Sequence, residues 1–160
     1  MERIEWGSYS CGCGRSAGHL GGDLRSLISA ETEEQARGVG LFGHVEYGGV
    51  ISEVAPCAVS VIVSALGESL HSVARLKMLE TVLASLSGEE TEWVDGIPVG
   101  SCSRIVYSGL RTFYQEAVSG ESEIALDILE LVEGDIERLE YFRNFVIDNP
   151  VKKRGRRGRG

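Results

Sequence analysis

Two cysteines separated by one glycine form the most metal-like cluster in the chain. They are Cys11-Gly12-Cys13, and His19 follows six residues later. Thiolates and imidazoles are ligands that Zn²⁺ prefers, and a closed zinc site takes four of them, commonly as two pairs. No second pair is evident in the sequence. Cys11, Cys13 and His19 are therefore candidate metal ligands, but the sequence favours a glycine-rich segment with two incidental thiols, and we expect no cofactor.

A cysteine nucleophile would need a histidine as its base and a third group to orient that histidine. The remaining cysteines are Cys57 and Cys102, and the remaining histidines are His44 and His71, which both fall within predicted helices. No catalytic signature surrounds any of the cysteines. We therefore predict that the protein is not an enzyme. A small metal- or thiol-dependent enzyme built around the Cys-x-Cys pair is a lesser alternative.

Acidic side chains crowd the stretch from 121 to 140. Glu123, Asp127 and Glu130 fall at i, i+4 and i+7 of a predicted helix, and Glu133 and Glu137 continue the pattern. The simplest interpretation is a solvated outer face, because charge runs usually are that. The functional interpretation is a docking surface for a basic protein partner. Electrostatic attraction there would speed association and weaken with salt.

Trp93 lies in a predicted loop, between Glu92 and Asp95. An aromatic side chain in a long loop can anchor a binding partner. It can also fold back onto the hydrophobic core, which we favour slightly.

The C-terminal tail, residues 150–160, has a composition opposite to that of the rest of the chain. The net charge of the protein is −8, but residues 1–151 hold ten basic and 24 acidic side chains. An acidic body repels nucleic acid, so any nucleic-acid contact would depend on the tail, with the basic side chains Lys152, Lys153, Arg154, Arg156 and Arg157. The composition of the tail is also typical of disorder, and the tail lacks aromatic residues that stack on bases. A third interpretation is that the tail covers the acidic face of the same chain.

The bulk composition indicates one soluble globular domain. The chain has 160 residues, of which 42% are hydrophobic and 25% charged. No apolar run reaches the roughly 20 residues of a membrane helix, and the N-terminus lacks a signal-peptide pattern. We expect a cytoplasmic protein whose four cysteines are thiols.

The elements that position these residues are predicted to be helices. The most apolar stretch, residues 53–87, reads as a helical hairpin, with Pro56 in the first turn and Gly88 as the stop. Its first helix is apolar almost all round and should be covered on most sides. The other predicted helices span about 20–28, 32–47, 101–118, 122–132 and 136–148, after an irregular segment at 1–19.

An internal repeat carries most of the fold prediction. Residues 72–82 align with 122–132 at an offset of 50, and residues 36–41 align with 74–79 at an offset of 38. One unit of roughly 38 residues, copied three times, accounts for both offsets if about 12 residues are inserted after the second copy. This period lies just below that of two-helix HEAT-type repeats. The predicted repeats span about 20–49, 53–88 and 101–134, with an insertion loop at 89–100.

With this repeat in view, the chain resembles bacterial HEAT-like helical repeat proteins of the ARM/HEAT type. The resemblance covers residues 6 to about 134. It rests on Trp6, the segment 9–14, the leucine-rich segment 20–27, the Tyr47-Gly48-Gly49 turn and Pro56-Cys57-Ala58-Val59. The Cys-x-Cys pair and the insertion depart from the pattern. The resemblance implies an all-α, right-handed α-solenoid of about three HEAT-like helix pairs plus a capping helix at 135–148.

Proteins of this type are often interaction scaffolds, and some are immunity proteins that guard a bacterium against a toxin. The resemblance offers no catalytic residue. We therefore predict a non-enzymatic protein-binding scaffold, most specifically an immunity-type protein that occludes a basic partner. The predicted contact residues are Glu123, Asp127, Glu130, Glu133, Glu137 and Trp93. The alternative is a nucleic-acid-associated regulator that works through the basic tail.

Overall fold

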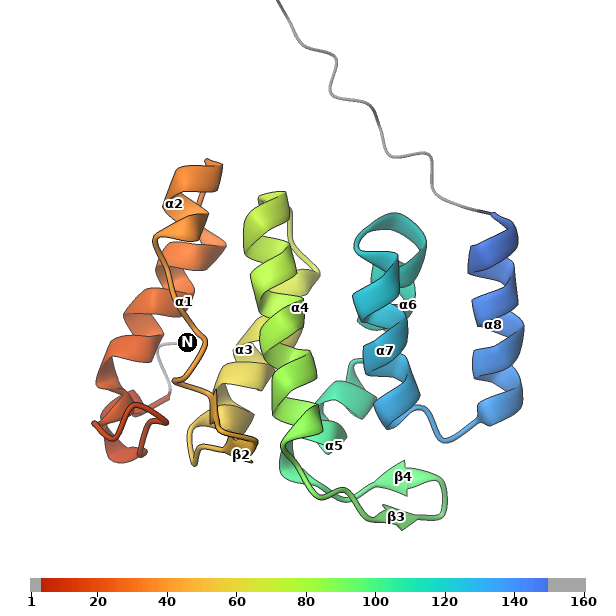
Figure 1. The fold of residues 1–160 in the computed structure, drawn as a ribbon, viewed down its shortest axis with the longest axis horizontal. Coiled ribbons are helices and arrows are strands. Elements are labelled where there is room, and N and C mark those ends of the chain that lie inside the picture. The colour runs from red at the N-terminus through yellow and green to blue at the C-terminus, as the bar shows by residue number, and fades with distance from the viewer. Residues whose placement is uncertain (1–3, 150–160) are drawn as a thin grey trace, which may run out of the picture.

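The computed structural model describes residues 4–149, and this part of the chain is mostly helical (Figure 1). The all-α class predicted from the sequence is confirmed. The helices are α1 (Leu20–Ile28), α2 (Glu33–Arg37), α3 (Ala55–Leu66), α4 (Ser72–Ser87), α5 (Ser101–Ser108), α6 (Leu110–Ser119), α7 (Ser122–Val132) and α8 (Ile136–Asp148). Two 3₁₀ helices, η1 (Trp6–Ser8) and η2 (Ala17–His19), precede them. The short strands are β1 (Glu46–Tyr47), β2 (Val50–Ile51), β3 (Trp93–Val94) and β4 (Ile97–Pro98).

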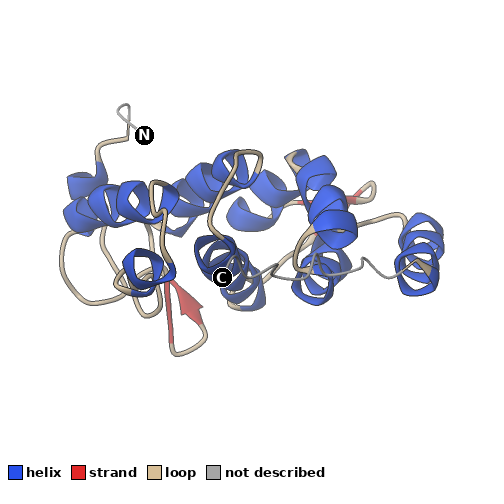
Figure 2. Ribbon diagram, turned by 90° about the horizontal axis from the view of Figure 1, so that it is seen from above, coloured by secondary structure: helices blue, strands red, loops and turns tan. Residues whose placement is uncertain are grey.

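The helices lie in two rows, which are seen from above in Figure 2. In one row α1 packs on α3 and α3 on α5, and in the other α2 packs on α4 and α4 on α7. The rows meet where α1 contacts α2, α3 contacts α4, and α6 contacts α7. Helix α8 contacts α7 and closes the C-terminal end of the second row. None of the described helices combines the length and the apolar character needed to cross a bilayer.

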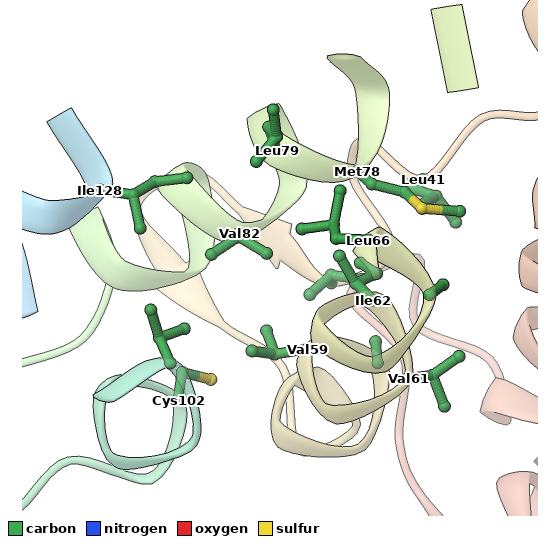
Figure 3. Close-up of a cluster of buried hydrophobic side chains, with 14 of the residues drawn as sticks. Leu41, Val59, Val61, Ile62, Leu66, Met78, Leu79, Val82, Cys102 and Ile128 are labelled. Atoms are coloured by element: carbon green, nitrogen blue, oxygen red, sulfur yellow. The ribbon is translucent and has the colours of Figure 1, made fainter. Parts of the chain in front are cut away.

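Helix α3 is at the centre of the hydrophobic core. Seven of its twelve residues are buried, and Pro56 occupies its first turn, where a missing N–H costs nothing. Each fully buried aliphatic side chain contributes about 1.5–3 kcal/mol relative to an exposed one. Figure 3 shows the cluster that forms between α3 (Val59, Ile62, Leu66) and α4 (Met78, Leu79, Val82), with Cys102 of α5 and Ile128 of α7 nearby.

The predicted helix at 32–47 is wrong, because α2 ends at Arg37. The ammonium group of Lys77, on α4, donates hydrogen bonds to three backbone carbonyls at and just after the end of α2, at 2.6–3.0 Å. These carbonyls belong to Ala36, Arg37 and Val39. Gly43 then takes a left-handed backbone, with φ of 77°, which a continuing α-helix excludes. The chain from residue 38 to 45 is irregular and leads into β1.

Two other predicted boundaries also change. The helix predicted at 101–118 is divided at Gly109 into α5 and α6. An added Cβ at Gly109 would lie 2.5 Å from Val63 of α3, so a glycine here lets the α5–α6 junction approach α3 closely. The segment predicted as an insertion loop at 89–100 contains the β3–β4 hairpin.

Both hairpins precede a helix of the first row, since β1–β2 leads into α3 and β3–β4 leads into α5. Each has two turn residues with positive φ, Gly48-Gly49 in the first and Asp95-Gly96 in the second. This is the conformation that tight two-residue hairpins require. The segment at 89–100 therefore has a structural counterpart at 46–51.

Candidate functional site

Four side chains meet at the N-terminal end of the molecule: Cys11, Cys13, His19 and His44. Their potential ligand atoms all lie within 4.8 Å of one another. The Cys11 sulfur is 3.3 Å from the Cys13 sulfur, 3.3 Å from Nδ1 of His44 and 3.7 Å from Nε2 of His19. The two imidazole nitrogens are 3.0 Å apart. We call these four residues the Cys/His cluster.

A tight turn presents the two cysteines of the cluster. The backbone N–H of Cys11 donates to the carbonyl of Arg15, and the N–H of Gly14 donates to the carbonyl of Cys11, both at 2.9 Å. Gly14 adopts a φ of 77°, which glycine reaches without steric cost. The turn is closed by a β-bridge between Ser10 and Ser16.

The two histidines come from different parts of the chain. His19 ends η2, immediately before α1, and its Nδ1 lies 3.2 Å from the carbonyl of Ser16. Because a carbonyl only accepts, Nδ1 must carry the proton, which leaves the lone pair on Nε2 facing the cluster. His44 lies in the irregular stretch between α2 and β1.

Gly12 brings the cysteine turn and the His44 stretch together. Its N–H donates to the carbonyl of His44 at 2.8 Å. A Cβ at this position would lie 2.7 Å from the carbonyl oxygen of Gly43 and 3.1 Å from that of His44. A glycine between the two cysteines is therefore required for this close approach.

The two thiols have different environments. Cys13 is exposed, and its pKa is lowered to about 6 by hydrogen bonds from the backbone and side chain of Arg15 and from Cys11. Cys11 is 5% exposed, and burial raises its pKa. A thiolate is both the nucleophile and the metal-binding form of cysteine.

The structure brings the three predicted ligands together and adds a fourth, His44. The sequence interpretation missed His44 because it placed this residue inside the helix predicted at 32–47. Gly43, directly before it, was the available signal, because glycine inside a helical pattern weakens that pattern. The preference for incidental thiols depended on the lack of a fourth ligand, and that premise is corrected.

The other cysteines and the third histidine are positioned for structural roles. Cys102 is fully buried at the start of α5, and burial raises its pKa to about 12, so it stays a neutral thiol at pH 7. Cys57 is half-buried in α3. His71 caps α4, because its Nδ1 accepts a hydrogen bond from the N–H of Val73 at 3.3 Å.

Three of the predicted acidic contact residues are exposed: Glu123 and Asp127 on α7, and Glu137 in the first turn of α8. Glu130 is also exposed, but it forms an ion pair with Arg143 of α8. Three carboxylates of the predicted set therefore stand in solvent without an ion-pair partner among the described residues.

The inclusion of Glu133 among the surface contacts is wrong, because this side chain is only 2% exposed. Its carboxylate accepts hydrogen bonds from the guanidinium of Arg138 at 2.6 and 3.2 Å, from the hydroxyl of Tyr114 at 2.7 Å and from the N–H of Asp135 at 2.9 Å. Burial alone would raise its pKa, but these donors hold the pKa of Glu133 below its ordinary value.

Trp93 lies on β3 and is 43% exposed, so its indole is neither fully free nor folded into the core. Val94 and Ile97 of the same hairpin are also exposed, at 57% and 43%. The five basic residues of the nucleic-acid alternative (Lys152, Lys153, Arg154, Arg156 and Arg157) lie outside the described residues.

No family model matches the chain, and neither the curated proteins nor the solved structures include a match to it.

Proposed function

We propose that the protein is a non-enzymatic helical-repeat scaffold that binds a basic protein partner. In this proposal the two rows of helices form a right-handed α-solenoid of about three HEAT-like pairs, α1–α2, α3–α4 and α5/α6–α7, capped by α8. The alternating contacts within and between the rows support this arrangement. So does the sequence repeat, although the hairpins place its period nearer to 47 residues, the spacing between β1 and β3.

The observation that carries the proposal is the charge of the surface. Residues 4–149 hold 23 acidic and nine basic side chains. Four of the nine basic side chains form ion pairs with carboxylates of the same chain, namely Arg37, Arg75, Arg138 and Arg143. The remaining carboxylates create a negative field that attracts a cationic partner and accelerates its association.

The last two helices carry both exposed carboxylates and exposed apolar side chains. Glu123, Asp127 and Glu137 lie on α7 and α8, and α8 also exposes Tyr141 and Phe145, at 77% and 46%. Protein interfaces typically combine aromatic anchors with a polar rim. An immunity-type protein would use such a surface to cover the active site of a basic toxin and block it by occlusion.

The test is binding to basic proteins, with the products of neighbouring genes screened first, measured by calorimetry at several salt concentrations. The triple substitution Glu123→Lys, Asp127→Lys and Glu137→Lys should weaken binding by at least about tenfold, because several charge pairs of the interface reverse sign. It should also flatten the dependence of the affinity on salt.

A second triple variant is the control, since Glu31, Glu80 and Glu90 are exposed carboxylates outside α7 and α8. Their reversal to lysine makes the same change in net charge at different places. If both triple variants lose the same affinity, only net charge matters and the α7–α8 surface is not the docking site. An unchanged affinity in the first variant contradicts the proposal.

A further inference from the structure

We propose that Cys11, Cys13, His19 and His44 form a Zn²⁺ site that ties the N-terminal segment to the stretch between α2 and β1. This inference is independent of partner binding and of the repeat architecture. Two thiolates and two imidazoles are the ligand set of a closed structural zinc site, in which the protein fills all four tetrahedral positions.

The distances within the Cys/His cluster fit a tetrahedral ion. With Zn–S of about 2.3 Å and Zn–N of about 2.0–2.1 Å, the ligand atoms of a regular tetrahedron lie about 3.3–3.8 Å apart. Four of the six pairs in the cluster lie 3.0–3.7 Å apart, and no pair exceeds 4.8 Å. Shifts of a few tenths of an ångström in most pairs would therefore complete the coordination.

The surroundings of the ligands orient them toward a common centre. A metal-binding histidine usually donates its other N–H to a carbonyl or carboxylate, which fixes the tautomer and the plane of the ring. His19 has this arrangement, because its Nδ1–H donates to the carbonyl of Ser16 and its Nε2 faces the cluster. The hydrogen bond from the Gly12 N–H to the carbonyl of His44 sets the distance between the cysteine turn and the second histidine.

The donor atoms, together with their close spacing around one point, favour a single Zn²⁺ ion. Ca²⁺ and Mg²⁺ require oxygen ligands, and cubane iron–sulfur clusters require four cysteines. Mixed thiolate and imidazole ligands in a tetrahedral arrangement suit Zn²⁺. Since all four positions come from the protein, no open position remains for a substrate or a water molecule, and the role of the metal is structural.

The metal would link parts of the chain that have little apolar contact of their own. The segment from residue 7 to 18 contains four glycines, and within it Cys11 and Ala17 are the buried hydrophobic residues. His44 is 25 residues from His19 and 33 from Cys11. One ion bound to all four side chains therefore closes two loops of the chain. The free energy of metal binding then adds to the folding stability of this end of the molecule.

The first measurement is the metal content of the full chain purified without chelators, followed by Zn²⁺ titration of the chelator-treated protein. We expect one zinc per chain. Zn²⁺ at about a thousandfold excess over its Kd should raise the thermal midpoint by about 10 °C. Co²⁺ in place of Zn²⁺ should give the thiolate charge-transfer and ligand-field bands of a tetrahedral site, a readout that does not depend on stability.

The variants Cys13→Ser and His44→Gln should each lower the affinity for Zn²⁺ by more than about 100-fold, because removal of a direct ligand exceeds the loss caused by outer-shell changes. Cys57→Ser and His71→Asn are matched controls that should keep one zinc, and asparagine preserves the helix cap. If a ligand variant fails to fold, the unmodified chain still tests the site. Added Zn²⁺ should then protect Cys11 and Cys13 from an alkylating reagent.

Three results would overturn the proposal. One is a purified chain without zinc whose thermal midpoint and thiol reactivity do not respond to added Zn²⁺. Another is a cobalt spectrum without thiolate bands. The third is equal loss of metal in the Cys57→Ser control and the Cys13→Ser variant. Any of them would leave the cluster as a set of hydrogen-bonded thiols and imidazoles only.

Discussion

The two ends of the molecule partner their clustered polar side chains in opposite ways. At the N-terminal end, two thiols and two imidazoles converge with weak hydrogen bonds among themselves. In the C-terminal half, two carboxylates are buried against arginines, as Glu116 pairs with Arg75 and Glu133 pairs with Arg138. These two carboxylates thus have counter-charges from within the chain, whereas the N-terminal cluster presents ligands that an external cation would satisfy.

The two buried carboxylates also differ from each other. Both oxygens of Glu133 accept hydrogen bonds, and the pKa of Glu133 is lowered. Glu116 is 5% exposed, one of its oxygens pairs with Arg75, and the other has no partner among the described residues. Burial raises the pKa of Glu116 despite the arginine. The number of donors around a buried carboxylate therefore decides whether its charge stabilises the fold.

The largest effect is expected from Arg75→Met, which removes the only counter-charge paired with Glu116 among the described residues. A buried charge left without its partner costs about 3–5 kcal/mol. Arg75 also donates to the carbonyls of Leu66 and Glu68, and the variant loses these bonds as well. Urea unfolding at pH 7 measures the loss. At pH 4 the loss should shrink, because a protonated Glu116 carries no charge.

Arg111→Met is the control for this prediction. Arg111 lines the same surface hollow as Arg75, but it is exposed. Its replacement should change the free energy of unfolding by less than about 0.5 kcal/mol. Equal losses for Arg75→Met at pH 7 and pH 4 would show that the charge of Glu116 is not responsible.

A smaller effect is expected from Glu133→Gln, which should lower the free energy of unfolding by about 1–3 kcal/mol at pH 7. The reason is that Arg138, Tyr114 and the N–H of Asp135 lose a charged acceptor. The lowered pKa of Glu133 means that its stabilisation is present above the ordinary value of 4.5 and is lost as the pH falls through the folded-state pKa. The variant should therefore lose less stability than the wild type between pH 5 and pH 3.

Glu116→Gln should behave in the opposite way. Because the pKa of Glu116 is raised, folding favours its protonated form, and stability declines as the pH rises from 4.5 through the folded-state pKa. Glutamine removes this decline, so the variant should be within about 1 kcal/mol of the wild type at pH 7. Parallel pH profiles for the two glutamine variants would contradict the distinction between the carboxylates.

The same comparison shows what the sequence could and could not predict. The helices α3, α4, α7 and α8 were predicted close to their observed bounds, because their apolar spacing is regular and local. The glycines after α2 were a local sign against the long helix, but the end at Arg37 was not predictable from them alone, because the partner of its last carbonyls, Lys77, lies 40 residues further along the chain. Beyond this end the chain is irregular, so His44 lies outside a helix, where it reaches Cys11.

The error at Glu133 has a related cause. Its spacing from Asp127 and Glu130 suggested an exposed face, but α7 ends at Val132, so Glu133 no longer follows the helical phase. Its carboxylate turns inward to Tyr114 of α6 and Arg138 of α8. Periodicity predicts which face of a helix is buried, but it does not predict where a side chain beyond the helix end will point.

The smallest effect is expected at the turns of the two hairpins, which differ at one position. Gly48 and Asp95 both have positive φ, at 63° and 50°, as the first residues of their two-residue turns. Asparagine tolerates this conformation and reduces the freedom of the unfolded chain, so Gly48→Asn should stabilise the protein by about 0.4–1 kcal/mol. Nothing lies within 4 Å of a Cβ at Gly48, so no clash opposes the gain.

Gly48→Val is the matched variant, because it adds a side chain at the same open position but disfavours positive φ. It should cost about 1–2 kcal/mol. The difference between the two variants in urea unfolding isolates the backbone preference from any contact of the side chain. If asparagine and valine at residue 48 change the stability equally, the turn is not held in the left-handed conformation in solution. The structural equivalence of the two hairpins would then lose its physical basis, since the same pair of positive φ angles defines both.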